Sequence, residues 1–423
     1  MELASIIVFV LLFGVIAFTQ LMTRFINLTQ PSILGFYSIV FCFMAIGLLG
    51  FGESESFKDR VGYIDFLYAL LLHIFFLLLP YIVCYSLNIN NLKLSSNTFR
   101  HANIIRPKNE KLIFVALLFV FTLIFIHQLI FLPTLPIFLL FQNVTGEELA
   151  LAREDSFKLN DSPFVYLWHF NRMIFAPLVT LSAYLIYANE IVSPRRWQAV
   201  FIIVTIFACI NSSLSSALAP VAMIFLMIFL IRNYSLKKVS RQYTALMMVV
   251  VLAFPILVEF VFSDGDILAS ATNTALKVFN RFSIETFDRT LLYFDLFPYS
   301  QDYLGGSTNR LFTIFTGNEF YNVQNYAFLY YVENIMGDQL REHLMYGSLN
   351  ANFIGYMNAD FGLMGVVISS AVMGIILTYF EMRMMKLEKN IFVLSLYIML
   401  VIIFWKMMGT QPASILVGHG GIL

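Results

Sequence analysis

The feature that most constrains this chain is a series of apolar runs, each close to 20 residues long, that recur along almost its whole length. The hydrocarbon core of a bilayer is about 30 Å thick, and about 20 residues of helix cross it. The pattern therefore predicts ten transmembrane helices, at residues 4–23, 32–51, 63–88, 111–132, 164–188, 198–211, 217–231, 244–262, 362–381 and 391–408. The Gly-rich tail that follows is short enough to leave open an eleventh helix or a half-helix.

The composition excludes an ordinary soluble domain. Hydrophobic residues make up 59% of the chain and charged residues 12%, whereas soluble domains carry about 25% charged residues. The mean hydropathy is +0.79. A soluble core has no room for this much apolar surface, so most of it is expected to face lipid or other helices. The fold class predicted is all-α and polytopic, with 10–11 spans.

The net charge, the cysteines and the start of the chain indicate which partners, metal sites and targeting signals to expect. The formal net charge is zero, which predicts no nucleic-acid partner. Cys42, Cys84 and Cys209 all fall within apolar runs and are interpreted as small buried hydrophobes. There is no CxxC or HExxH motif, so no metal site is predicted. The first run lacks a preceding Lys or Arg and a small-residue cleavage site, which favours a retained helix over a signal peptide.

The distribution of Lys and Arg predicts the orientation of the spans. One set of short loops holds fifteen positive residues and the opposite set holds four. The positive-inside rule places the first set in the cytoplasm. Segments 133–163 and 263–361 then lie outside. The domain organisation predicted is a bundle of eight helices over 1–262, a large outer loop over 263–361, and a second bundle segment over 362–423.

The long loop 263–361 is rich in aromatic residues and is not of low complexity. Such a composition favours packing against the membrane domain over exposure to solvent. The stretch 271–297 has helical periodicity, and the sequence YLGGSTNR that follows it contains turn residues.

The first candidate site lies in the stretch KVFNRFSIETFDR. In a helix, Lys277, Arg281, Glu285 and Arg289 are four residues apart and share one face, with Asp288 beside them. Arginines suit bidentate recognition of phosphate oxygens, and a carboxylate between them is a candidate proton acceptor. The alternative is a self-neutralising ladder of i,i+4 ion pairs on a solvated helix face.

The second candidate is Arg172, which has His169 on the same helical face and lies about two turns inside the fifth span. A charge at this depth is costly and normally faces the interior of the bundle or a wet cavity. The alternative is snorkelling to the outer interface beside Tyr166 and Trp168.

Two further candidates lie in the outer segments. Arg153, in LAREDSFK, is placed to reach an anionic group at the membrane surface, or else belongs to an ordinary surface helix end. His343, beside Arg341 and Glu342, is a candidate general base, since histidine accepts a proton near neutral pH; the alternative is a structural histidine.

Other polar residues in or near the spans have simpler interpretations. Asp65 and Glu259 are close to predicted outer ends, where a hydrated interfacial position accounts for them. His73 and His127 are expected to hydrogen-bond to neighbouring helices. Lys406 is expected to snorkel.

The sequence has no Walker loop and no dinucleotide fingerprint, and Asp264-Gly-Asp266 is a weak match to a metal-binding acidic pair. An outward-facing active site has no supply of ATP or nucleotide sugar. Its donor is therefore expected to arrive already activated, for example as a lipid-linked diphosphate sugar, and no cofactor is predicted.

This layout resembles that of the Wzy-type O-antigen and oligosaccharide repeat-unit polymerases of bacteria. The resemblance rests on the many spans rich in Phe, Leu and Ile, the arginines of the outer loops and the large late periplasmic loop. The segment NANFIGYMNADFGLMGVV adds to it, because an Asn-rich approach leads to an FG pair that opens the next span.

The resemblance implies a GT-C-like, metal-independent glycosyltransferase of the bacterial inner membrane, with its active site facing the periplasm. Its substrate would be undecaprenyl-diphosphate-linked oligosaccharide, with a chain-length regulator as a possible partner. Arg153, Arg172, Arg281 and Arg289 match the functional outer-loop arginines, and His343 or Glu285 would be the base. The related O-antigen ligases share this layout, and a lipid-linked oligosaccharide flippase is the alternative from another class.

Overall fold

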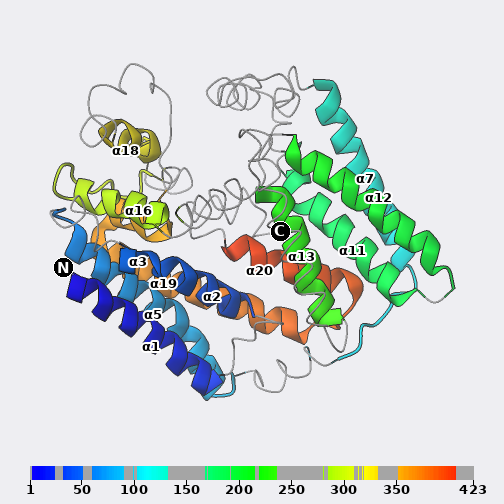
Figure 1. Cartoon of the computed structure of the whole chain (residues 1–423), viewed down its shortest axis with the longest axis horizontal. Coiled ribbons are helices and arrows are strands. Elements are labelled where there is room, and N and C mark those ends of the chain that lie inside the picture. The colour runs from blue at the N-terminus through cyan, green and yellow to red at the C-terminus, as the bar shows by residue number, and fades with distance from the viewer. Residues whose placement is uncertain are drawn as a thin grey trace, which may run out of the picture. The chain divides into compact units, whose positions relative to one another are not determined.

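The fold is that of an all-α membrane protein, seen here in a computed structural model (Figure 1). The structure describes residues 2–23, 32–50, 60–89, 99, 102–131, 167–168, 170–190, 192–214, 219–235, 280, 284–308, 313, 317, 319–331 and 351–405. These residues contain no strand, and their one β-bridge pairs Ile105 with Asn390. The class predicted from the apolar runs is thus confirmed at this level.

The chain divides into two compact units, one of residues 1–96, 272–383 and 404–416, and the other of residues 97–271, 384–403 and 417–423. The first unit contains helices α1 (Glu2–Thr23), α2 (Ile33–Ala45), α3 (Gly47–Gly50), α5 (Tyr63–Ser86), α16 (Ile284–Leu296), α18 (Val323–Tyr331) and most of α19 (Phe353–Lys386). The second contains α7 (Glu110–Phe131), the π-helix η2 (Asn171–Phe175), α11 (Ala176–Asn189), α12 (Pro194–Ser213), α13 (Ala219–Ser235) and most of α20 (Ile391–Trp405).

Four helices of the described residues are long and apolar enough to cross a membrane: α1 from Leu3, α5, α7 and α19. Three shorter apolar helices lie at Ile33–Cys42, Val221–Tyr234 and Ile391–Phe404. Each predicted span that the structure describes contains helix, although the second is divided at Ile46 between α2 and α3. The eighth predicted span, 244–262, and the tail lie outside the described residues.

Polar side chains join the apolar helices of the first unit. The imidazole of His73 on α5 is fully buried, and its Nε2 and Nδ1 are hydrogen-bonded to Tyr37 Oη at 2.7 Å and Ser370 Oγ at 2.8 Å. In the same unit, the Ile33 backbone N–H donates to Glu381 Oε2 at 2.8 Å. In the second unit, Trp168 Nε1 donates to His127 Nδ1 at 3.0 Å. The expectation that His73 and His127 bond to neighbouring helices is confirmed.

Helix α16 belongs to the predicted long loop and packs on α5, α3 and α2. The ring of Phe287 lies 5.8 Å from that of Phe66 and 6.5 Å from that of Phe41, and Phe294 lies 5.6 Å from Phe66. Phe287 and Phe294 are almost fully buried. This part of the loop therefore packs against the apolar helices, as its aromatic content predicted.

Helix α19 is broken at Gly362, where φ is 66° and ψ is −161°. Asp360, just before the break, accepts hydrogen bonds from the backbone of Gly306 and Thr308 and from Thr308 Oγ1 at 2.5 Å. The turn at residues 305–308 is thereby tied to the first segment of α19. The second segment begins where the ninth span was predicted to begin.

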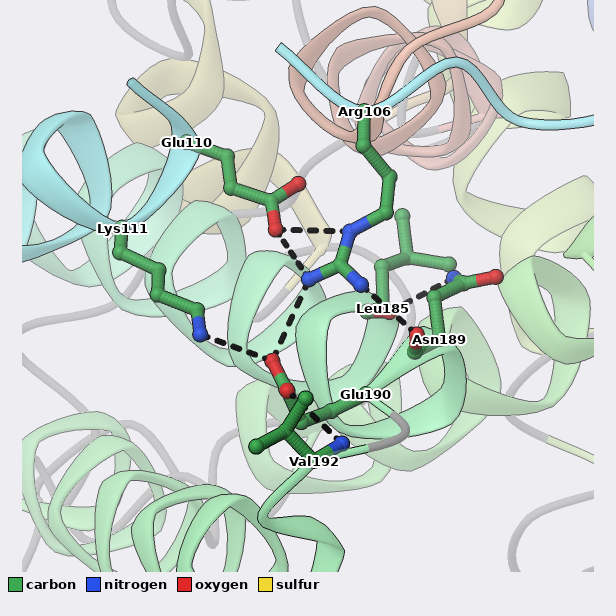
Figure 2. A network of polar contacts seen from close by, with 7 residues as sticks. All are labelled: Arg106, Glu110, Lys111, Leu185, Asn189, Glu190 and Val192. Atoms are coloured by element: carbon green, nitrogen blue, oxygen red, sulfur yellow. Dashed lines mark hydrogen bonds and ion pairs between the residues drawn. The ribbon is translucent and has the colours of Figure 1, made fainter. Parts of the chain in front are cut away.

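In the second unit, an ionic network joins the start of α7 to the end of α11 (Figure 2). Arg106 contacts Glu110 and Glu190 and donates to the Asn189 carbonyl at 2.8 Å, and Lys111 contacts Glu190 Oε2 at 2.9 Å. The hydrogen bond from Lys111, supported by that from Arg106, lowers the pKa of Glu190 to about 2. Glu190 is therefore ionised throughout the physiological pH range, so its ion pairs with Arg106 and Lys111 persist across that range.

Candidate functional site

Of the six residues given a catalytic or diphosphate-binding role from the sequence, three lie in the described part of the chain. Glu285 and Arg289 are on α16 in the first unit, and Arg172 is in η2 in the second. Arg153, Arg281 and His343 lie outside the described residues. The structure therefore brings Glu285 and Arg289 together.

Helix α16 is amphipathic in the way that its sequence requires. Phe287, Leu291 and Phe294 recur at helical spacing and are buried against the apolar helices. Glu285, Asp288, Arg289 and Asp295 occupy the remaining surface of the helix. With Arg60, which precedes α5, these four residues make up what we term the α16 cluster.

Arg60 is the centre of the α16 cluster. Its Nη2 lies 3.2 Å from Asp288 Oδ1, and its Nη1 lies 3.5 Å from Asp295 Oδ2. Side-chain exposure is only 11% for Arg60, 21% for Asp288 and 14% for Asp295, so solvent screens these pairs weakly. On the rim, Arg289 Nη2 donates to Glu285 Oε2 at 2.8 Å, with side chains 33% and 44% exposed.

A close backbone approach holds Arg60 in place. The Gly62 N–H donates to Asp295 Oδ1 at 2.9 Å. A Cβ at Gly62 would lie 2.3 Å from the backbone carbonyl of Phe294, a distance that no side chain tolerates. Glycine at this position thus allows α16 to rest directly on the turn that opens α5.

Burial shifts the protonation of the two central carboxyls. Burial raises the pKa of Asp295 to about 6, against the opposing effects of the Gly62 N–H and Arg60. Burial also raises the pKa of Asp288, although Arg60 and Arg289 both oppose the shift. A carboxyl with a pKa of about 6, such as Asp295, exchanges its proton close to neutral pH, which is the property required of a general acid or base.

The α16 cluster has three carboxyls and two guanidiniums, a formal charge of −1 when all are ionised. An anion such as diphosphate would gain little from the cluster as a whole. Carboxyl and guanidinium groups side by side instead suit the hydroxyl groups of a sugar, which both donate and accept hydrogen bonds. The same charges act on Tyr331 of α18. Burial is the main cause of the raised pKa of its phenol, and the negative charge of Asp288 raises this pKa further.

Glu285 and Arg289 form the i,i+4 ion pair that their spacing predicted, which is also the self-neutralising arrangement left open as the alternative. Sequence reasoning missed Arg60 and Asp295 as members of the site. Asp288 and Asp295 are seven residues apart and so share a helix face, which is a usable signal. Arg60 gave no such signal, because its partners are more than 200 residues away along the chain.

Arg172 is half-buried in η2, immediately before α11. Single-turn π-helices within α-helices often occur at functional sites. The amide of its neighbour Asn171 is fully buried and donates through Nδ2 to the Phe121 carbonyl at 3.3 Å. Asp65, on α5 in the first unit, accepts a hydrogen bond from Tyr299 Oη at 2.9 Å, and this exposed contact fits the interfacial position expected for it.

Among the described residues, no group of three or more His, Cys, Asp or Glu side chains is arranged to hold a metal ion. Comparison of the chain with protein-family models, with curated proteins and with solved structures found no match. The functional argument therefore depends on the chemistry of the residues themselves.

Proposed function

We propose that this chain is a membrane glycosyltransferase that polymerises undecaprenyl-diphosphate-linked oligosaccharide repeat units into O-antigen or a related surface polysaccharide. The observation that carries the proposal is the α16 cluster. It combines half-buried carboxyls of raised pKa with guanidiniums at the end of an apolar helix long enough to cross a membrane. The bacterial inner membrane and a periplasmic active site are part of the proposal.

The chemistry asked of the cluster is a displacement at an anomeric carbon. The acceptor hydroxyl oxygen forms the new bond, the bond to the lipid diphosphate breaks, and the acceptor proton passes to a carboxylate. Asp288 suits the acceptor role because it is less buried than Asp295 and lies beside the rim pair. Glu285 on the rim, or His343, is the alternative base.

The departing diphosphate takes the electron pair and needs positive charge nearby. Arg289 of the rim pair and Arg281, on the same stretch of sequence, are assigned to it. Arg153 and Arg172 remain candidates for phosphate binding from the sequence alone. Electrostatic neutralisation of this kind requires no metal. A chain-length regulator is proposed as a protein partner.

The test is reconstitution of the purified chain with lipid-linked repeat units from its own source, with polymer length read as ladders on gels. Asp288→Asn is expected to lower polymer formation about 100-fold or more, since a positioned base contributes a factor of about 10² to 10⁴. Glu319→Gln, an exposed carboxyl in the same predicted outer loop, is the matched control and should retain the full ladder.

Other results would point elsewhere. Transfer of one finished glycan to a lipid core without extension would indicate a ligase. Movement of intact precursor across the membrane without new glycosidic bonds would indicate a flippase. A full ladder from Asp288→Asn, Glu285→Gln and Arg289→Ala at normal protein levels would overturn the assignment of the α16 cluster.

A further inference from the structure

The second unit contains three buried polar side chains whose hydrogen-bonding capacity is only partly used within the chain. Asn211 is 0% exposed, and neither its Oδ1 nor its Nδ2 has a partner. Ser212 is 1% exposed, with no partner for Oγ. Asn171 is 0% exposed, and its Oδ1 is without a partner although its Nδ2 is bonded to Phe121.

The helical hairpin places these residues at one end of the unit. Helices α11 and α12 run side by side (Figure 1), and only residues 190–193 separate them along the chain. The arm formed by η2 and α11 covers residues 171–189, and α12 covers residues 194–213, so the two arms are nearly equal in length. Antiparallel arms of equal length bring the last turn of α12, with Asn211 and Ser212, opposite η2, and η2 packs on both α12 and α7.

Unpaired amides are costly in such a place. A buried donor or acceptor that lacks a partner loses its hydration without compensation, and no bulk water is present in an apolar bundle to restore it. The buried amide of Asn358, in the first unit, shows the usual arrangement: its Nδ2 donates to the carbonyls of Tyr293 and Phe297 at 3.4 and 3.2 Å. Unpaired atoms on three such side chains indicate an external polar ligand.

The free atoms define the chemistry of that ligand. Asn211 offers donors and an acceptor, Ser212 offers both, and Asn171 offers an acceptor. A fully ionised phosphate has only acceptors and would leave both amide oxygens unpaired. A hydroxyl group donates and accepts, so adjacent hydroxyls of a sugar pair with all three side chains.

We infer that Asn171, Asn211 and Ser212 form a binding site for the neutral, hydroxyl-rich head group of a glycolipid. By the predicted topology the site lies at the outer ends of the fifth and sixth spans, at the depth where a lipid-borne sugar meets the membrane. The inference rests on the proposed function for the identity of this lipid, since the substrate proposed there carries such a sugar.

The experiment measures binding of hexyl β-glucoside to the purified full chain in nanodiscs by calorimetry. Asn211→Leu and the smaller change Ser212→Ala are each expected to weaken binding about tenfold, the effect of losing one or two hydrogen bonds. Asn211→Leu should also melt no lower than the parent, because it removes an unpaired buried amide. The matched control Asn358→Leu breaks two hydrogen bonds and should melt lower while keeping its affinity for the glucoside.

Two further probes separate the sources of the sugar and its charge. Methyl β-glucoside should bind more weakly than hexyl β-glucoside if the sugar is lipid-borne, and equal affinity would overturn the glycolipid assignment. Hexyl phosphate that binds as tightly as the glucoside would overturn a neutral site. The site itself is overturned by a lack of saturable glucoside binding, by unchanged affinity in both variants, or by Asn211→Leu melting as low as Asn358→Leu.

The outcome is separable from that of the polymerase proposal. Loss of the polymer ladder in Asp288→Asn tests the polymerase, and loss of glucoside affinity in Asn211→Leu tests this site, so either proposal can fail without the other. Glucoside binding without polymerisation would retain the sugar site and reject the polymerase.

Discussion

Arg60 lies between two carboxyls that are two turns apart on the same helix, so a single guanidinium determines how α16 rests on the start of α5. Removing the guanidinium would leave Asp295 without a counterion and Asp288 with Arg289 alone, which costs more than the ion pair itself contributes. Arg60 therefore has a structural as well as a chemical role, and the carboxyls are better targets for testing function.

Asp295 makes stability depend on pH in a direction opposite to that of a surface acid. Its folded pKa is about 6, against an ordinary value of 3.8, so the folded protein keeps this proton where the unfolded chain has released it. The contribution of Asp295 to the free energy of unfolding is therefore largest below about pH 4 and is lost as the pH rises through about 6. Arg60, Asp288 and the Gly62 N–H are the groups that face this carboxyl.

Thermal unfolding in detergent at several pH values checks this prediction. Between about pH 4 and pH 7, the melting temperature of the parent should fall more than that of Asp295→Asn, which has no such proton to lose. Glu388→Gln, at an exposed carboxyl, should follow the parent. Identical pH profiles for the parent and Asp295→Asn would show that Asp295 titrates normally.

The sequence predicted local pairs at the residue scale and missed distant ones. Glu285 and Arg289 were predictable because i,i+4 spacing fixes their proximity before any tertiary contact forms. The partnership of Gly62 with Asp295 joins residues 233 positions apart, and only packing of Phe287 and Phe294 on Phe66 creates it. The raised pKa values of Asp288 and Asp295 depend on the same packing, so the sequence alone could not predict them.

At the scale of elements, the break in α19 allows a helix longer than the bilayer is thick to fit the membrane. Its 34 residues would extend about 51 Å if unbroken, well beyond a hydrocarbon core of about 30 Å. The break at Gly362 leaves a second segment of suitable length. Hydropathy located the start of this segment but not the helix before it, whose Asn and Asp residues are held by contacts such as that between Asp360 and Thr308.

Gly374 of α19 allows this helix to approach α5 closely, as small residues often do between membrane helices. A Cβ at this position would lie 2.4 Å from the Leu77 carbonyl oxygen, which is backbone and cannot move aside locally. Gly374→Ala is therefore expected to destabilise the protein by about 1–3 kcal/mol, measured as denaturant unfolding in detergent. Gly14→Ala is the matched control on α1: no atom lies within 4 Å of its Cβ, and no loss is expected. Equal stability of the two variants would contradict the close contact.

At the scale of the whole molecule, the predicted orientation places residue 319 outside and residue 388 inside. Both positions are exposed in the structure. In a background with Cys42, Cys84 and Cys209 replaced by Ala, Glu319→Cys should react with an impermeant maleimide added to intact cells. Glu388→Cys should react only after the inner membrane is opened. The reverse pattern would invert the topology and place the α16 cluster in the cytoplasm.

The hydrogen bond between His73 and Ser370 has a consequence for the order of synthesis. The two residues are 297 positions apart, and much of the second unit is encoded between them. Tyr37 and His73 emerge early and can pair at once, but His73 Nδ1 has no native partner until Ser370 is made. At roughly 5–20 residues per second, that delay is roughly 15–60 s. The nascent first unit must therefore persist in the bilayer as an incomplete bundle, in which His73 Nδ1 lacks its native partner until α19 has been synthesised.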